Sequence, residues 1–213
     1  MTKYQHIIWD WNGTLFDDAW LCVELMNEMR KKRNMPLIDQ KIYQSLFDFP
    51  VIEYYRRLNF DLKKEPFEKL GTEFMAAYEK RKLACALQPE VLSTLEKVKD
   101  LDIAQSILSA YRQEHLTALV EHYQLSSFFT YIIGLDNHYA YGKVELGKML
   151  LKKLSLSPEK ILFVGDTVHD YDVAKKVGTD CILIPSGHHN LEKLKSCGVP
   201  VIASLRGLCT LLS

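Results

Sequence analysis

Short apolar runs recur along the 213-residue chain, and their spacing is the feature that most constrains its fold. The runs are Tyr4–Trp9, Ile103–Leu108, Tyr131–Ile133, Ile161–Val164, Cys181–Ile184 and, more weakly, Val199–Ala203. Most are continuous rather than alternating, which is typical of strands buried on both faces of a parallel sheet. Helical patterns separate them, at Glu90–Lys99, Arg112–Tyr123, Val144–Leu154, Asp172–Val177 and Leu191–Ser196. This alternation predicts an α/β fold built on a doubly wound parallel sheet.

The segment from residue 18 to residue 86 breaks the alternation, because it carries helical patterns throughout. A single crossover between parallel strands needs a helix of only about a dozen residues, and this segment is several times longer. We therefore expect an inserted all-helical domain at 18–86, with residues 1–17 and 87–213 forming the α/β core. Asp17–Asp18 and Leu87–Pro89 are the expected hinges.

The composition is that of an ordinary globular protein, with 47% apolar and 25% charged residues. Lys plus Arg and Asp plus Glu number 27 each, so we expect no attraction to nucleic acid or to an anionic membrane. The sequence contains no apolar stretch long enough to span a bilayer and no signal-peptide pattern. We expect a cytoplasmic protein, a monomer or weak homodimer with free cysteines, that acts on a small molecule.

Polar side chains follow three of the predicted strands at the point where each strand ends. Asp10 follows HIIW, Ser109 follows SIL, and Asp166 follows ILFVG. Ligands of open α/β sheets bind at this carboxyl edge. Asp170 lies four residues beyond Asp166, and Lys143 lies in a glycine-bearing turn before a helix. Each could be an ordinary cap or turn residue, but together they predict a site.

These elements resemble, in order and spacing, those of the haloacid dehalogenase-like (HAD) hydrolase superfamily, and within it the phosphoglycolate phosphatase-like members with a helical cap. The similar elements are DWNGTL at 10–15, Ser109, Lys143 and VGDTVHD at 164–170. The resemblance implies a Rossmann-like catalytic core, a helical cap and a small phosphorylated substrate.

The resemblance also implies a role for each site residue. Asp10 would be the nucleophile that accepts the phosphoryl group, and Ser109 and Lys143 would hold the phosphate. Asp10, Asp166, Asp170 and the backbone carbonyl of Asn12 would bind Mg²⁺.

Simple electrostatics supports these roles. Three carboxylates brought together without a cation repel one another, and hard oxygen ligands suit Mg²⁺. Lys143 adds a compact positive charge and Ser109 a hydroxyl donor. Lys148 is a weaker alternative to Lys143, because it lies inside the following helix. Covalent capture by a carboxylate would divide one difficult displacement into two easier steps.

Asn12 departs from the family pattern, which usually has Asp at this position. Its amide has no titratable proton, and losing a positioned general acid typically costs about 10²–10⁴ in rate. We therefore expect a slow phosphatase that favours aryl or acyl phosphates, whose leaving groups depart without a proton.

Three other protein classes would differ from this sequence. A dehalogenase would have Tyr at position 12, and a phosphonate-cleaving enzyme would have Ala there together with a Lys in the cap. A receiver domain would lack the insertion. A regulatory protein that binds phosphate and metal without useful turnover is the alternative from another class.

Other conspicuous side chains receive plainer interpretations. His169 is expected to face solvent in a loop, and the pair His188–His189 to lie in a surface loop. The charge run Arg30–Arg33 is expected to be a solvated helix end. Within the insertion, Phe49, Tyr54 and Arg57 could equally face the substrate, the core or solvent.

Overall fold

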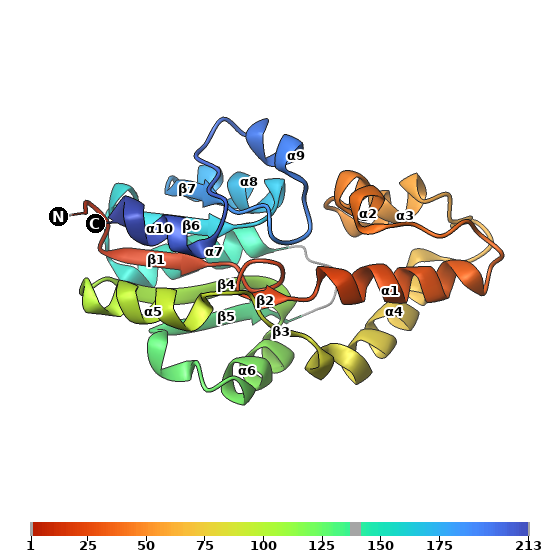
Figure 1. Ribbon diagram of the computed structural model, residues 1–213, viewed down its shortest axis with the longest axis horizontal. Coiled ribbons are helices and arrows are strands. Elements are labelled where there is room, and N and C mark those ends of the chain that lie inside the picture. Colours follow the sequence, from red (N-terminus) through yellow and green to blue (C-terminus); the bar gives the residue numbers. More distant parts are fainter. Residues whose placement is uncertain (1, 137–141, 213) are drawn as a thin grey trace.

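A five-stranded parallel sheet forms the centre of the molecule (Figure 1). The computed structural model describes residues 2–136 and 142–212. The sheet comprises β1 (His6–Trp9), β4 (Ala104–Arg112), β5 (Tyr131–Leu135), β6 (Ile161–Gly165) and β7 (Asp180–Leu183). Its order is β5-β4-β1-β6-β7, and all neighbouring pairs are parallel. The order reverses at β1, so the carboxyl ends of β1, β4 and β6 meet at a switch point. The predicted fold class is confirmed.

Helices cover both faces of this sheet. Helices α5 (Val91–Asp100), α6 (Gln113–His122) and α10 (Leu205–Leu212) pack on one face, and α7 (Lys143–Leu154), α8 (Val168–Val177) and α9 (Leu191–Lys195) on the other. Alternate residues of β1 enter the two cores: Ile7 and Trp9 join the first and Ile8 the second, all with no exposed surface.

The carboxyl-terminal region differs from the sequence prediction. The weak run Val199–Ala203 forms no strand and contributes one isolated bridge, between Leu183 and Val201. Helix α10, which we did not predict, follows it and buries Leu205, Leu208 and Leu212. These leucines are spaced three and four residues apart, so a helical signal was present in the sequence.

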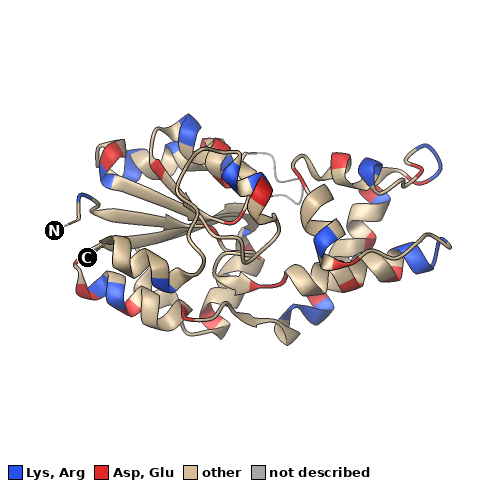
Figure 2. Ribbon diagram, turned by 45° about the horizontal axis from the view of Figure 1, so that its top comes forward, with Lys and Arg blue, Asp and Glu red and all other residues tan. Residues whose placement is uncertain are grey.

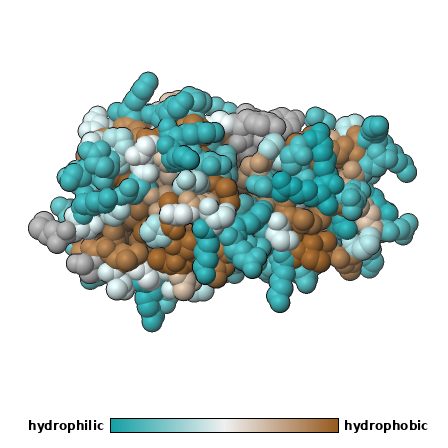
Figure 3. Space-filling model, turned by 90° about the horizontal axis from the view of Figure 1, so that it is seen from above, coloured by the Kyte–Doolittle hydropathy of each residue, from teal (hydrophilic) through white to brown (hydrophobic). Residues whose placement is uncertain are grey.

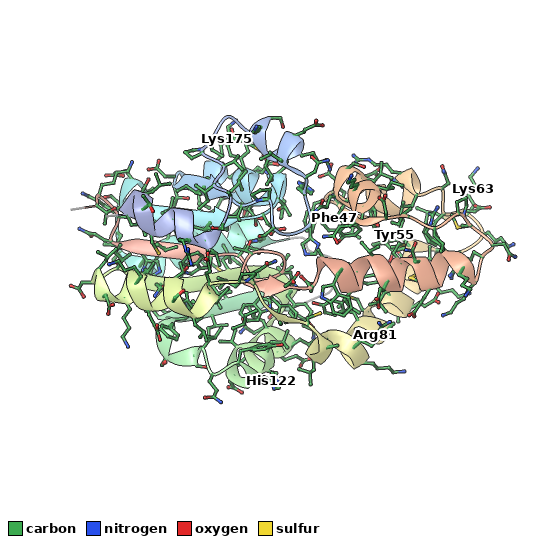
Figure 4. All side chains as sticks on the ribbon, viewed as in Figure 1. Phe47, Tyr55, Lys63, Arg81, His122 and Lys175 are labelled. Carbon is green, nitrogen blue, oxygen red and sulfur yellow. The ribbon has the colours of Figure 1, made fainter. Side chains whose placement is uncertain are left out.

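The segment between β2 (Phe16–Asp17) and β3 (Ala86–Leu87) is helical. It contains α1 (Ala19–Lys31), α2 (Gln40–Leu46), α3 (Val51–Arg57) and α4 (Phe67–Arg81), and extends beyond the carboxyl edge of the sheet (Figure 1). Strands β2 and β3 pair antiparallel, so the chain leaves and re-enters the sheet region side by side. Figure 4 shows Lys63 at the end of the insertion farthest from the sheet, and Phe47 much nearer to it.

The charge run at the end of α1 is only partly solvated, which corrects the sequence interpretation. Arg30 is 5% exposed, and its guanidinium donates to the carbonyl oxygens of Pro36 and Leu58 at 2.6 and 2.7 Å. Arg33 binds the carboxylates of Glu65 and Glu73. The donors of Arg30 thus satisfy backbone groups inside the insertion.

The outer surface carries mixed charges. Basic and acidic residues are interspersed over the helices of both halves (Figure 2), and apolar areas lie on both halves of the face shown in Figure 3. Within residues 2–136 and 142–212, no helix is both long enough and apolar enough to cross a membrane.

Buried His6 makes the stability of the core depend on pH. It is 1% exposed, and its Nε2 lies 2.9 Å from the Ser106 hydroxyl. That oxygen also accepts from the Tyr131 N–H, so its own hydrogen can be donated to a neutral imidazole. Burial lowers the pKa of His6 to about 4.

We expect His6→Gln to weaken the loss of stability in acid. The unfolded chain binds this proton near pH 6.5 and the folded chain only near pH 4, so stability present above pH 6.5 is lost as the pH falls. Between about pH 6.5 and 4.5, the free energy of unfolding of the unmodified protein should fall by about 2–3 kcal/mol more than that of His6→Gln. Urea titrations measure this. His122→Gln, at an exposed histidine on α6 (Figure 4), is the control, and equal slopes for His6→Gln and the unmodified protein would refute the assignment.

Candidate active site

Lys143 lies at the centre of the candidate site. Gly142, with φ of 114°, precedes it, and Lys143 begins α7 with 1% of its surface exposed. Its Nζ lies 2.5 Å from Asp10 Oδ1 and 2.6 Å from Asp170 Oδ1. One buried ammonium therefore joins the end of β1 to the first turn of α8.

Three carboxylates meet around this ammonium. Asp10 follows β1, Asp166 follows β6, and Asp170 lies in α8; one oxygen from each lies within 4.8 Å of the others. All are buried. The sequence predicted this convergence from the positions of strand ends, and the structure brings the three side chains together.

Hydrogen bonds hold two of these carboxylates in place. Asp166 accepts from the Thr14 hydroxyl at 2.9 Å and from the backbone N–H of His188 at 2.6 Å. Asp170 accepts from the Thr167 hydroxyl at 2.6 Å and the Thr167 N–H at 3.0 Å, within a capping box that begins α8. This cap explains why α8 begins at Val168, four residues before the predicted start.

Two glycines allow the close approach of Asp166. A Cβ atom at Gly13, which has φ of 78°, would lie 2.2 Å from Asp166 Oδ2. A Cβ atom at Gly187 would lie 2.1 Å from the same oxygen. Any larger side chain at either position would displace this carboxylate.

The pKa values of the three carboxyl groups show that the cluster has too little positive charge to balance them. Burial, and then the carboxylates of Asp170 and Asp166, raise the pKa of Asp10 well above its ordinary value despite Lys143. Burial likewise raises the pKa of Asp166 to about 6. Burial also opposes ionisation of Asp170, but Lys143 and Thr167 outweigh it and lower that pKa. Buried carboxylate oxygens lacking sufficient counter-charge are a donor set that fits Mg²⁺.

Ser109 lies beside this cluster on β4, which continues past the predicted end to Arg112 with an irregular register after Leu108. The Ser109 hydroxyl oxygen accepts from the Tyr111 N–H at 3.0 Å. Its own hydrogen remains available as a donor. Ser109 lines the same cavity as Asp10 and Lys143.

The Asn12 side chain has a fixed orientation. Its Nδ2 donates to Asp18 Oδ2 at 2.8 Å and to the Tyr78 hydroxyl oxygen at 2.9 Å. An ionised carboxylate only accepts, so the amide nitrogen rather than the oxygen must face Asp18. The role of the Asn12 backbone carbonyl stays a prediction.

Asp18 is a site residue that sequence reasoning missed, since we treated it as part of a linker. It is 1% exposed and accepts from the Tyr78 hydroxyl at 2.7 Å and the Gly13 N–H at 3.0 Å. Burial opposes its ionisation, but His188, Tyr78 and Asn12 lower its pKa overall. A buried, ionised carboxylate therefore lies one hydrogen bond away from position 12.

The interpretation of His188 and His189 as a surface loop is wrong. They are 6% and 0% exposed. His188 Nδ1 lies 2.8 Å from the Tyr43 hydroxyl of α2, and Nε2 lies 3.4 Å from Asp18. Burial disfavours the charged form of His188, yet the neighbouring carboxylates, led by Asp18, raise its pKa to about 9. His189 accepts from the Val168 N–H at 3.0 Å, and burial lowers its pKa to about 4.

His169 also differs from its prediction as a solvent-facing loop residue. It belongs to α8, packs against Phe49 with ring centroids 4.5 Å apart, and lines the cavity. Burial and Lys143 lower its pKa. Of the three insertion residues left open, Phe49 and Tyr54 line the cavity. Arg57 is exposed and pairs with Asp48.

A cavity of about 490 Å³ joins the carboxylate cluster to the helical insertion. Asp10, Ser109 and Lys143 line one end, and side chains of α1 to α4 line much of the remainder. Its volume lies within the range of about 300–1,000 Å³ that is typical of small-molecule sites.

A family model for haloacid dehalogenase-like hydrolases matches residues 7–184, which include the whole cluster. The chain belongs to the haloacid dehalogenase-like hydrolase family. It is 24% identical to "Probable phosphatase IndB" of Dickeya dadantii, over 92% of this chain and 87% of that protein. It is also 24% identical to phosphoglycolate phosphatase 1 of Pseudomonas aeruginosa, over 95% of this chain and 77% of that protein. A haloacid dehalogenase-like protein of Streptococcus pneumoniae shares its fold over the full length of both chains, with a TM-score of 0.85 and 18% identity.

The Asn12–Asp18 contact predicts an unequal response to two substitutions. Asn12→Asp replaces an amide that donates to Asp18 at 2.8 Å with a second carboxylate. We expect this repulsion to lower the free energy of unfolding at pH 7 by about 1–3 kcal/mol. Asn12→Asp combined with Asp18→Asn exchanges the partners and should recover part of that loss, because Asp18→Asn also removes the carboxylate that pairs with His188. A double-mutant cycle in urea measures the coupling, and additive effects would contradict the contact.

Proposed function

We propose that this protein is a Mg²⁺-dependent phosphatase that transfers the phosphoryl group of a small phosphomonoester to Asp10 and then to water. The observation that supports it best is the buried contact of Asp10 with Lys143 at the end of β1, open to a ligand-sized cavity. Family membership and the similarity to named phosphatases agree with this proposal.

The proposed mechanism assigns a role to each residue of the cluster. An Asp10 carboxylate oxygen attacks phosphorus while the bond to the leaving oxygen breaks, and water then cleaves the aspartyl-phosphate to restore Asp10. Lys143 holds the transferring group against Asp10, and Ser109 donates its hydroxyl hydrogen to a phosphate oxygen. Asp10, Asp166, Asp170 and the Asn12 carbonyl would hold Mg²⁺, which when bound neutralises phosphate charge.

Asn12 affects the step in which the bond to the leaving oxygen breaks. The leaving oxygen needs a proton unless its anion is stable by itself, and an amide has none to give. Both hydrogens of the Asn12 amide are donated, to Asp18 and Tyr78, so this side chain stays in place. The same residue favours the second candidate function, a regulatory protein that binds phosphate and metal but turns over little.

The helices α1 to α4 are proposed to act as a cap over the site, with the β2–β3 pair as its hinge. Two contacts reach across from α2 to the segment after β7: the Tyr43 hydroxyl to His188, and Gln44 Nε2 to the Gly187 carbonyl at 2.8 Å. The backbone N–H of His188 binds Asp166. Cap closure would therefore be coupled to the position of a metal ligand.

The first functional prediction concerns the nucleophile. Hydrolysis of 4-nitrophenyl phosphate should require Mg²⁺, stop on chelation with EDTA, and be inhibited by beryllofluoride, which imitates a phosphoryl group on Asp10. Asp10→Asn should lower kcat by about 10³ or more, because it removes the attacking oxygen. Asp100→Asn, at an exposed residue of α5, should keep full activity. Full Mg²⁺-dependent turnover by Asp10→Asn would overturn the mechanism.

The second functional prediction concerns the leaving group. The unmodified protein should hydrolyse aryl and acyl phosphates faster than alkyl phosphates. Asn12→Asp with Asp18→Asn should raise kcat for alkyl phosphates about 10²-fold and change aryl phosphate turnover little. Asp18→Asn alone is the control for loss of the neighbouring carboxylate. Unchanged alkyl phosphate turnover in the double variant would assign proton transfer to another group, and His169 and His188 would be examined next.

A further inference from the structure

The cavity has two chemically different ends. Asp10, Ser109 and Lys143 form a polar end that suits the phosphate group. The opposite end extends under the cap, and the cavity as a whole measures about 490 Å³. A phosphate group and a two-carbon chain would leave most of that space unfilled. The cap end therefore has room for a leaving group larger than a two-carbon chain.

Apolar and aromatic side chains form the cap end. Phe49 and Ile52 come from α3 and the loop before it, and Phe67, Phe74 and Met75 come from α4. These five residues are only half-buried, although all of them line the cavity. Covering apolar surface of this kind with an apolar ligand is favourable, because it removes that surface from water.

The charges of the cap end disfavour a second anionic group on the substrate. The described lining residues of the cap, between residues 18 and 86, include Asp18, Glu68 and Glu79 but no Lys or Arg. On the core side, Arg112 lies 2.9 Å from Glu114, and His115 lies 2.8 Å from Glu79. A carboxylate on the leaving group would thus meet acidic side chains, and both Arg112 and His115 already have acidic partners.

We infer that the substrate is a phosphomonoester of an aromatic ring system, with the ring bound between α3 and α4 and without a second anionic group. This inference rests on the proposed phosphatase activity and specifies its substrate class. Asn12 independently supports an aryl phosphate as substrate, since phenolate is a far better leaving group than an alkoxide when no acid is present. A small substrate with a second anionic group, such as phosphoglycolate, matches neither the apolar lining of the cap end nor the lack of an acid at position 12.

The test uses four substrates that separate ring binding from leaving-group chemistry. Phenyl phosphate has a ring and a good leaving group, and benzyl phosphate a ring and a poor one. Acetyl phosphate has a good leaving group without a ring, and ethyl phosphate has neither. Between two substrates with equally good leaving groups, we expect the one with a ring to have a KM about tenfold lower. We expect the quality of the leaving group to change kcat. Equal KM values for phenyl and acetyl phosphate would overturn the inference.

A binding measurement keeps the inference testable if no substrate is turned over. Benzylphosphonate and methylphosphonate cannot be hydrolysed, and isothermal titration with Mg²⁺ present gives their Kd values. Benzylphosphonate should bind about tenfold more tightly. Tight, ring-dependent binding without turnover would refute the phosphatase proposal alone. Turnover with equal Kd values for the two phosphonates would refute the aromatic site alone.

Substitutions locate the ring. Phe74→Ala should raise the Kd of benzylphosphonate about fivefold to tenfold and leave that of methylphosphonate unchanged, and Phe74→Leu should lie between. Phe74 packs against Tyr78, so the milder variant guards against misfolding. Phe129→Ala, at a half-buried phenylalanine that does not line the cavity, is the matched control. If Phe74→Ala and Phe74→Leu both bind the two phosphonates as the unmodified protein does, the ring does not bind at the cap end.

Discussion

The buried ammonium of Lys143 is the contact on which the rest of the site depends. It neutralises one charge among three carboxylates and joins β1, α7 and α8 at a single point. Buried ion pairs are weak sources of stability, because desolvation offsets most of their attraction. Folding stability alone therefore does not account for this cluster. Its remaining negative charge fits a divalent cation, and the glycines at 13 and 187 leave room for the Asp166 carboxylate in the cluster.

The environment of Asn12 changes how its substitution should be understood. Viewed alone in the sequence, it is a lost carboxylate. In the structure its amide lies against a carboxylate six residues further on, Asp18, which is itself bound to Tyr78. Position 12 could not hold an ionised carboxylate beside an ionised Asp18 without repulsion. Asn12 and Asp18 are thus better treated as one unit, and a single substitution at either position breaks a contact as well as changing the chemistry.

The sequence predicted the features that strand positions determine. Continuous apolar runs indicated a parallel sheet, and polar residues at strand ends indicated that Asp10, Ser109 and Asp166 would share one edge. It could not predict contacts made by loops. His188 is buried because the segment after β7 folds back over Asp166 and meets Tyr43 of α2, more than 140 residues away in sequence. Arg30 is buried for a similar reason, since its acceptors are backbone carbonyls, which leave no trace in the sequence.

The sequence also could not predict which residues of the helical insertion face the cavity, and the reason bears on function. Phe49, Tyr54 and Arg57 were indistinguishable in the sequence, because short helices with aromatic residues on several sides have no single apolar face. Their contacts in the structure distinguish them. Phe49 packs against His169 of the core and Tyr54 against Phe47, whereas Arg57 lies at the surface. In the proposed mechanism, a closed cap would exclude bulk water and so strengthen the interaction of Lys143 with a bound phosphate. Closure would also remove the bulk solvent that could otherwise protonate a departing oxygen. A site that lacks an acid at position 12 and is closed by aromatic side chains would therefore depend on the leaving group to stabilise its own negative charge, which an aromatic ring does by delocalisation.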